Sequence, residues 1–104
     1  MSKPRSVVIG GLTWKIFWNK DIPDALGLTH YDSREIWLLK SMDEIDKKSV
    51  FLHELLHAIW WSYTLKPRTD KKHFEEDVVS QLAPAILHVL QDNKSIAKYL
   101  LEDA

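Results

Sequence analysis

A chain of 104 residues, 45% of them hydrophobic and 28% charged, has the length and composition of one small globular domain. Its formal net charge of −1, with acids and bases interspersed, provides no basic field of the kind that attracts nucleic acid or an anionic membrane. Because cysteine is absent, disulfides and thiolate zinc ligands are excluded, and any metal must be held by histidine and carboxylate side chains.

The N-terminal part of the chain has the residue pattern of β-strands. Two β-prone runs flank Gly10-Gly11, a pair that suits a tight hairpin turn because glycine adopts positive φ at no steric cost. A second hairpin is expected around Asp32-Ser33-Arg34. The four expected strands are residues 6–9, 12–18, 28–31 and 35–39. Residues 6–39 are therefore predicted to form a small antiparallel sheet.

The pattern becomes helical after residue 39. Ser41 is expected to cap a helix that carries acids in its first turn and continues to Tyr63. The positions expected to face the core on this helix are Leu52, Leu56, Ile59 and Tyr63. A second helix is expected at 74–91 and a third at 95–101. The apolar stripe of the second helix comprises Val79, Leu82, Ala83, Ile86 and Leu90. The chain is thus predicted to be one α+β domain over residues 1–104, with strands in 6–39 and helices in 42–103.

An HExxH motif, His53-Glu54-Leu55-Leu56-His57, lies within the first predicted helix. Every other residue from Val50 to Trp61 is apolar. Since positions four apart share one helical face, His53 and His57 can hold one metal ion with Glu54 beside them as a base. A bound cation also offsets the cost of placing these polar groups in an apolar helix. The alternative is that both histidines point to solvent or bond to backbone and that Glu54 lies on a wet face.

Two histidines do not complete a catalytic zinc site, which usually has three protein ligands and one open position. No further histidine follows at the spacing of the longer three-histidine motif. The second helix begins with three acids, Glu75, Glu76 and Asp77, of which Glu76 is preferred because it is one turn from Ser80. Glu75 remains open as the ligand, and at least one of these acids is expected only to stabilise the helix N-terminus.

The segments FLHELLHAI, EEDVVSQLA and VLQDN resemble the small HExxH zinc metallopeptidases of phages and prophages. These belong to the ImmA/IrrE type, with a gluzincin site, and are more distantly similar to SprT-like domains. The resemblance covers roughly residues 28 to 93. It implies a minimal zincin-like fold in which His53, His57 and Glu76 hold Zn²⁺. It further implies that Glu54 activates a water molecule to hydrolyse a peptide bond in a peptide or protein substrate.

Several features of substrate binding are expected from the residue types. A peptide can add as a strand along the edge of strand 35–39, and Trp61 is expected near the substrate. A donor for the oxyanion is needed besides the metal. The candidates by type are His30, Tyr31, Tyr63 and His73.

Two functions compete with hydrolysis. One is a non-enzymatic zinc-binding interaction or regulatory module with a relic site, which a chain this short favours. The other is nucleic-acid binding through Lys47-Lys48 and Lys71-Lys72, but these pairs are expected to be solvated, so nucleic acid is not an expected partner. A signal-peptide pattern and a bilayer-spanning apolar run are both missing, which indicates a cytoplasmic protein without a membrane partner. The oligomeric state is left open.

Overall fold

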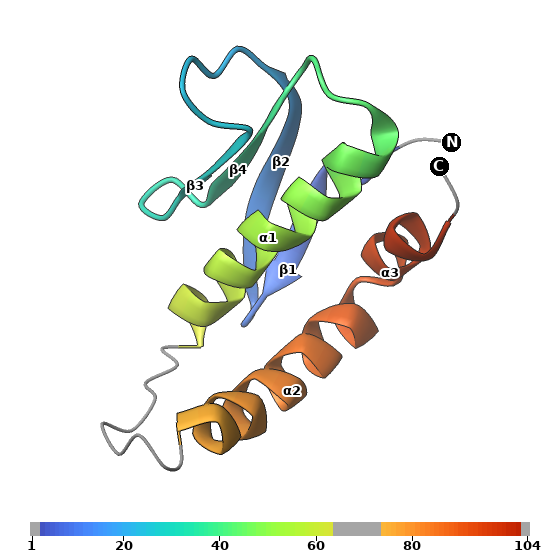
Figure 1. Ribbon diagram of the computed structural model, residues 1–104. Coiled ribbons are helices and arrows are strands. Elements are labelled where there is room, and N and C mark those ends of the chain that lie inside the picture. Colours follow the sequence, from blue (N-terminus) through green and yellow to red (C-terminus); the bar gives the residue numbers. More distant parts are fainter. Residues whose placement is uncertain (1–2, 64–73, 103–104) are drawn as a thin grey trace.

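The computed structural model describes residues 3–63 and 74–102, without the side chains of residues 74–76. Its strands precede its helices, as predicted for an α+β domain (Figure 1). The strands are β1 (Ser6–Ile9), β2 (Leu12–Lys20), β3 (Gly27–His30) and β4 (Glu35–Leu39). The helices are α1 (Glu44–Ser62), α2 (Phe74–Asp92) and α3 (Lys94–Leu101). None of the described helices combines the length and apolar character needed to cross a bilayer.

Both predicted hairpins are present. Gly10 and Gly11 join β1 to β2 with φ angles of 57° and 81°, the positive values that a two-residue turn requires at both positions. β3 and β4 pair antiparallel, with Thr29 opposite Ile36. Arg34, in the turn between them, is the one described residue other than glycine with positive φ, at 53°.

The sheet is mixed, so the prediction of an antiparallel sheet was wrong in one pairing. The strand order is β1-β2-β4-β3, and β2 runs parallel to β4. The second hairpin has been placed with β4 inside and β3 at the edge. This placement buries Ile36 and Leu38 of β4 completely, whereas β3 has no buried residue. Hydrophobic burial therefore selects the strand that lies in the middle.

Helix α1 crosses the sheet and begins two residues later than expected. Asp43, not Ser41, is the cap, and its carboxylate accepts the backbone N–H of Asp46 at 2.8 Å. The face that packs on the sheet is also rotated from the predicted one. Its buried apolar residues are Phe51, Leu55, Ala58 and Ile59. Leu52 is 42% exposed, because its position faces away from the sheet towards the other two helices.

Helices α2 and α3 lie along the β1 side of the sheet (Figure 1). The buried residues of α2 are Ala85 and Val89, while Val79 and Ala83 of the predicted stripe are exposed. The joint between the two helices is fixed by Asn93, whose amide bonds the backbone of β1. Its Oδ1 accepts the N–H of Val8 at 2.8 Å, and its Nδ2 donates at 2.7 Å to the carbonyls of both Val8 and Val89.

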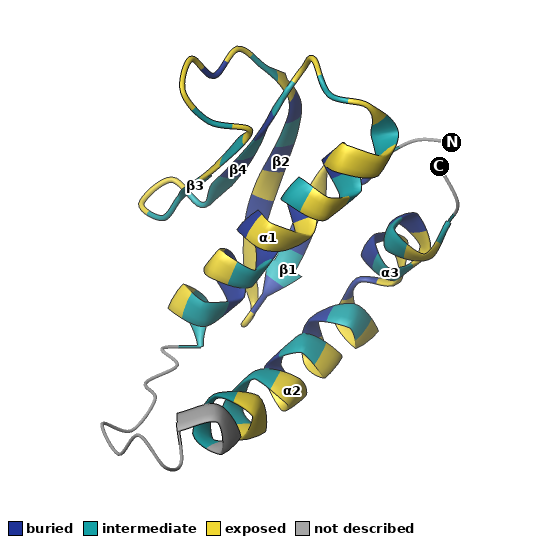
Figure 2. Ribbon diagram, in the orientation of Figure 1, coloured by how far each residue is buried: buried dark blue, intermediate teal, exposed yellow. Residues whose placement is uncertain are grey.

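The lysine pair near the start of α1 is not a solvated face, contrary to the expectation from the sequence. Lys47 is only 8% exposed, and burial together with the nearby charge of Lys3 lowers its pKa. Lys48 is half-buried; its Nζ lies 5.1 Å from the centre of the Tyr99 ring and donates to the backbone oxygen of Glu102. Lys48 therefore belongs to the contact between α1 and α3, and Lys47 is buried near Lys3 and Glu44. Figure 2 shows buried and exposed positions alternating around α1.

The carboxylate of Glu44, the first residue of α1, makes the stability of the protein depend on pH. Burial acts to raise the pKa of Glu44. The hydroxyl of Tyr99 at 2.9 Å and the ammonium of Lys3 at 3.3 Å together lower it by more, so the pKa lies below 4.5. Its stabilising contribution is present above pH 4.5 and is lost as the pH falls through the lowered pKa. We expect Glu44→Gln to lower the urea midpoint at pH 7 and to match the parent protein near pH 3, whereas Asp92→Asn, at an exposed position, should change neither midpoint.

Candidate metal centre

Helix α1 brings the two histidines of the motif together. The Nε2 atoms of His53 and His57 lie 3.2 Å apart, and their rings meet edge to face with centres 4.9 Å apart. A tetrahedral zinc ion with bonds of 2.0–2.1 Å to nitrogen separates two such ligand atoms by about 3.3 Å. The pair therefore has the spacing of two ligands to one ion.

A hollow of about 410 Å³ opens beside the histidines. Its described lining residues are His53, Leu56, His57 and Trp60 from α1, and Leu82 from α2. The side chain of His53 is 68% exposed, so the ligand atoms are accessible from solvent. Both helices thus border the site. The other described lining residues are hydrophobic, so the two imidazoles are the groups in the hollow that can bind a metal.

Glu54 lies on the opposite side of the pair and is buried, at 8% exposure, so the alternative was wrong in placing it on a wet face. Both histidines are exposed, as that alternative held. The hydroxyl of Thr29 on β3 donates to its Oε1 at 2.7 Å. Its Oε2 lies 4.0 Å from Nε2 of His53. One carboxylate oxygen is thus held by the sheet, and the other faces the histidine pair, where a water molecule beside a metal would need a base.

Gly27 permits this approach of strand and helix. A Cβ atom at position 27 would lie 2.8 Å from Cγ1 of Val50 and 2.9 Å from Cγ of Glu54. Any other residue would therefore displace one of these side chains. The absence of a side chain at this edge position lets Glu54 pack directly against β3.

The third predicted ligand, Glu76, and its alternative, Glu75, lie outside the described side chains. Among the described residues, no group of three or more histidine and carboxylate side chains is positioned to hold a metal. The structure therefore brings together His53, Glu54 and His57. Leu82 of α2 lines the hollow beside the two histidines.

His30, a candidate oxyanion donor, lies on the other face of the sheet. Thr29 points to α1, so its neighbour on the strand points away from it. The His30 ring packs on Trp37 with centres 4.3 Å apart, and its buried Nε2 has no hydrogen-bond partner among the described residues. This placement removes His30 from the oxyanion candidates.

The tyrosine candidates and Trp61 do not border the hollow either. Trp61 is 48% exposed and packs on Tyr31, with ring centres 5.6 Å apart. Tyr63 ends α1 and packs against the core. His73 lies outside the described residues. The tryptophan beside the histidines is Trp60, and the expectation that Trp61 lies near the substrate stays a prediction.

The predicted docking edge was also wrong. Strand β4 pairs with β2 on one side and with β3 on the other, so residues 35–39 have no free edge. Among the described strands, the edge nearest the site belongs to β3, the strand that carries Gly27 and Thr29.

No family model, no curated protein and no solved structure matches this chain. The assignment of the site therefore depends on its own geometry and on the residues that compose it.

Three of the residues that shape the site were not singled out from the sequence: Gly27, Thr29 and Trp60. Thr29 was considered only as a β-prone residue, because its inward direction is fixed by strand placement. Trp60 had a detectable signal, since it is seven positions after His53 and thus shares its helical face.

Proposed function

We propose that this protein is a zinc-dependent peptidase of the HExxH, gluzincin-like type. The observation that carries the proposal is the pair of imidazole nitrogens 3.2 Å apart beside a buried carboxylate held by a threonine hydroxyl. A phage or prophage origin, which derives from the sequence resemblance, is part of the proposal, and so is a cytoplasmic location.

The residues present fit the chemistry of a catalytic zinc site. A zinc ion held by His53 and His57 would act as a Lewis acid, lowering the pKa of water and polarising a peptide carbonyl. Glu54 would accept a proton from the attacking water and deliver it to the leaving amine. The hydrogen bond from Thr29 to Oε1 holds this carboxylate so that Oε2 faces the reacting groups.

The substrate in this proposal is an extended peptide that binds along β3. The free edge of this strand offers backbone donors and acceptors, as an added strand requires. Because Gly27 and Thr29 contact Glu54, a peptide on this edge would pass next to the proposed base. This replaces the edge at residues 35–39 that the sequence suggested.

The third ligand is proposed to come from the start of α2. Leu82 borders the histidine hollow, and seven residues, or two helical turns, separate it from position 75. Position 76 is six residues from Leu82, about a third of a turn short of two full turns. This period favours Glu75, whereas the sequence reasoning preferred Glu76, and both are retained as candidates for the experiment.

Zinc uptake by the metal-free protein tests the centre. We expect calorimetric titration to give one ion per chain, and His53→Ala or His57→Ala to lower the affinity by more than the ~100-fold that loss of an outer-shell partner causes. Glu75→Gln and Glu76→Gln identify the third ligand, since only one should match the histidine variants. His88→Ala, at an exposed position on α2, is the control. A failure of the parent protein to bind zinc, cobalt or another divalent ion would reject the proposal.

A non-enzymatic zinc-binding module is the second candidate. The observation that favours it is the 68% exposure of the His53 side chain, because a surface site does not exclude water from a reaction. This candidate predicts the same zinc stoichiometry but no dependence of any function on Glu54.

A further inference from the structure

The face of the sheet that points away from α1 is not covered by any described element. Along β2, the buried residues Trp14, Ile16 and Trp18 alternate with the exposed Lys15 and the half-buried Phe17. Along β4, buried Ile36 and Leu38 alternate with partly exposed residues in the same way. The exposed and partly exposed residues of both strands therefore lie on this outer face.

Aromatic rings meet at the centre of the outer face. Phe17 and Trp37 are direct partners on the two central strands, and His30 packs against Trp37 from β3. The ammonium of Lys20 lies over both rings, 4.8 Å from the centre of Phe17 and 4.2 Å from that of Trp37. A β-bulge between Phe17 and Lys20 brings the lysine to the same side.

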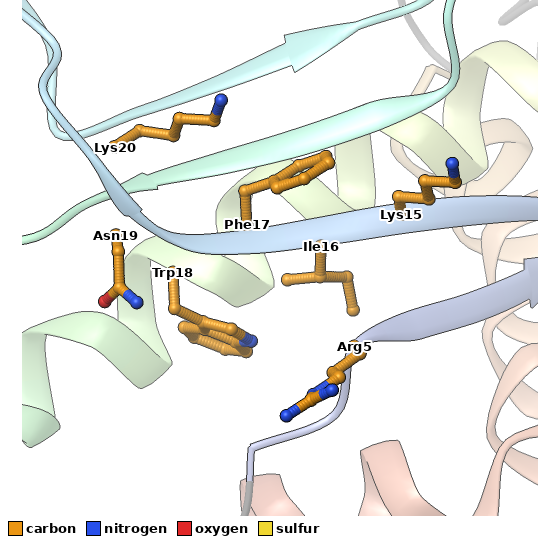
Figure 3. Close-up of a pocket in the computed structure, with 7 residues that line it drawn as sticks. All are labelled: Arg5, Lys15, Ile16, Phe17, Trp18, Asn19 and Lys20. Carbon is orange, nitrogen blue, oxygen red and sulfur yellow. The ribbon is translucent and has the colours of Figure 1, made fainter.

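A hollow of about 530 Å³ adjoins these rings along β2 (Figure 3). Its lining includes three cationic residues, Arg5, Lys15 and Lys20, and no acid. Figure 3 shows Lys15, Phe17 and Lys20 extending to the same side of the strand. The only acid in the four strands is Glu35, whose Oε1 accepts the indole N–H of Trp37 at 2.9 Å. The local charge is therefore positive although the whole chain is weakly acidic.

We propose that this outer face binds single-stranded nucleic acid. Lys15 and Lys20 pair with phosphates, and unstacked bases lie on the rings of Phe17 and Trp37. Four-stranded sheets that recognise single strands combine these two elements, because every base has a face that stacks and every nucleotide carries a negative charge. A duplex is disfavoured, since its bases are already stacked.

The position of Lys20 is compatible with this mode. In the free protein its ammonium occupies the space above the rings where a base would stack. A phosphate attracts that ammonium more strongly than an aromatic ring does, and a stacked base contributes more than an exposed cation–π contact. Binding thus exchanges one partner of Lys20 for another and uncovers the rings.

This proposal departs from the expectation that nucleic acid is not a partner. That expectation rested on the weakly acidic net charge of the whole chain and on Lys47-Lys48 and Lys71-Lys72, whereas the outer face uses Lys15 and Lys20 of β2. It is also independent of the proposed peptidase, because the histidine pair and the outer face lie on opposite sides of the sheet.

The experiment is fluorescence anisotropy of a labelled 15-nucleotide oligothymidine with the full chain over a range of salt concentrations. We expect the double substitution Lys15→Glu with Lys20→Glu to weaken binding at least tenfold. We also expect it to reduce the slope of log K against log salt by about 1.4, because each single-strand phosphate contact contributes about 0.7. Phe17→Leu should weaken binding severalfold with an unchanged slope, because it removes stacking and no charge.

The matched control is Lys94→Glu with Lys98→Glu, which makes the same charge change at exposed positions of α3. Circular dichroism melting establishes that each variant is folded, and His53→Ala should bind the oligonucleotide as the parent does. The proposal is overturned if the parent does not bind at low salt, or if the control pair weakens binding equally. Equal binding of a duplex, or equal displacement by polyglutamate, would also overturn it, because either result indicates attraction by charge alone.

Discussion

Glu54→Gln is expected to abolish peptide hydrolysis while the protein still binds zinc with its normal affinity. Glutamine has the shape of glutamate and can still accept the hydroxyl hydrogen bond of Thr29 through its amide oxygen. It cannot accept a proton from water, and a positioned general base contributes about 10²–10⁴ to the rate. The measurement is kcat for cleavage of a peptide library by the zinc-loaded protein, together with a zinc titration of the same sample.

Asp46→Asn provides the control for this substitution. It makes the equivalent carboxylate-to-amide change at an exposed position on the same helix. Hydrolysis should persist in this variant. If the parent cleaves peptides and Glu54→Gln cleaves them equally well, Glu54 is not the base. If the parent binds zinc but cleaves nothing, the interaction module becomes the better account of the site.

Asn93→Ala is expected to cause a large loss of stability, about 2–4 kcal/mol, because buried polar groups of the backbone lose their partners. The asparagine is 9% exposed and bonds the N–H and C=O of Val8 and the C=O of Val89. Its removal leaves the outer edge of β1 without these bonds and frees the joint between α2 and α3. The measurement is the free energy of unfolding from urea denaturation at neutral pH.

Gln91→Ala, at an exposed position two residues before the joint, should lie within about 0.5 kcal/mol of the parent protein. Asn93→Asp separates the two roles of the amide, since an aspartate can still accept the N–H of Val8 but cannot donate to either carbonyl. At neutral pH its stability should be no higher than that of Asn93→Ala, because its second carboxylate oxygen would face the carbonyl oxygens of Val8 and Val89. A loss below 1 kcal/mol in Asn93→Ala would contradict the structural role given to this side chain.

The parts of the fold that local pattern determines could be predicted. Gly10-Gly11 predicted a tight turn. The HExxH motif was placed correctly on a helix, because a helix brings residues four apart onto one face within about one turn. The order of the strands could not be predicted in this way. A hairpin with the same residues can sit with either strand inward, and the choice depends on which one buries more apolar surface beside β2.

The candidate site was predictable to the same extent. His53, Glu54 and His57 follow from spacing alone, whereas Thr29 matters only because β3 lies at the edge next to α1. The end of α2 beside Asn93 was predicted within one residue, yet the Asn93 side chain bonds a strand 85 residues earlier in the chain. A contact of that separation leaves no trace in local periodicity.

The bare backbone at Gly27 has a mechanical consequence. With no side chain to act as a spacer, the outermost strand and the acid of the motif are in rigid contact, so that a displacement of one is transmitted to the other. If a peptide binds along β3 as proposed, it would therefore act on the Glu54 side chain through this contact.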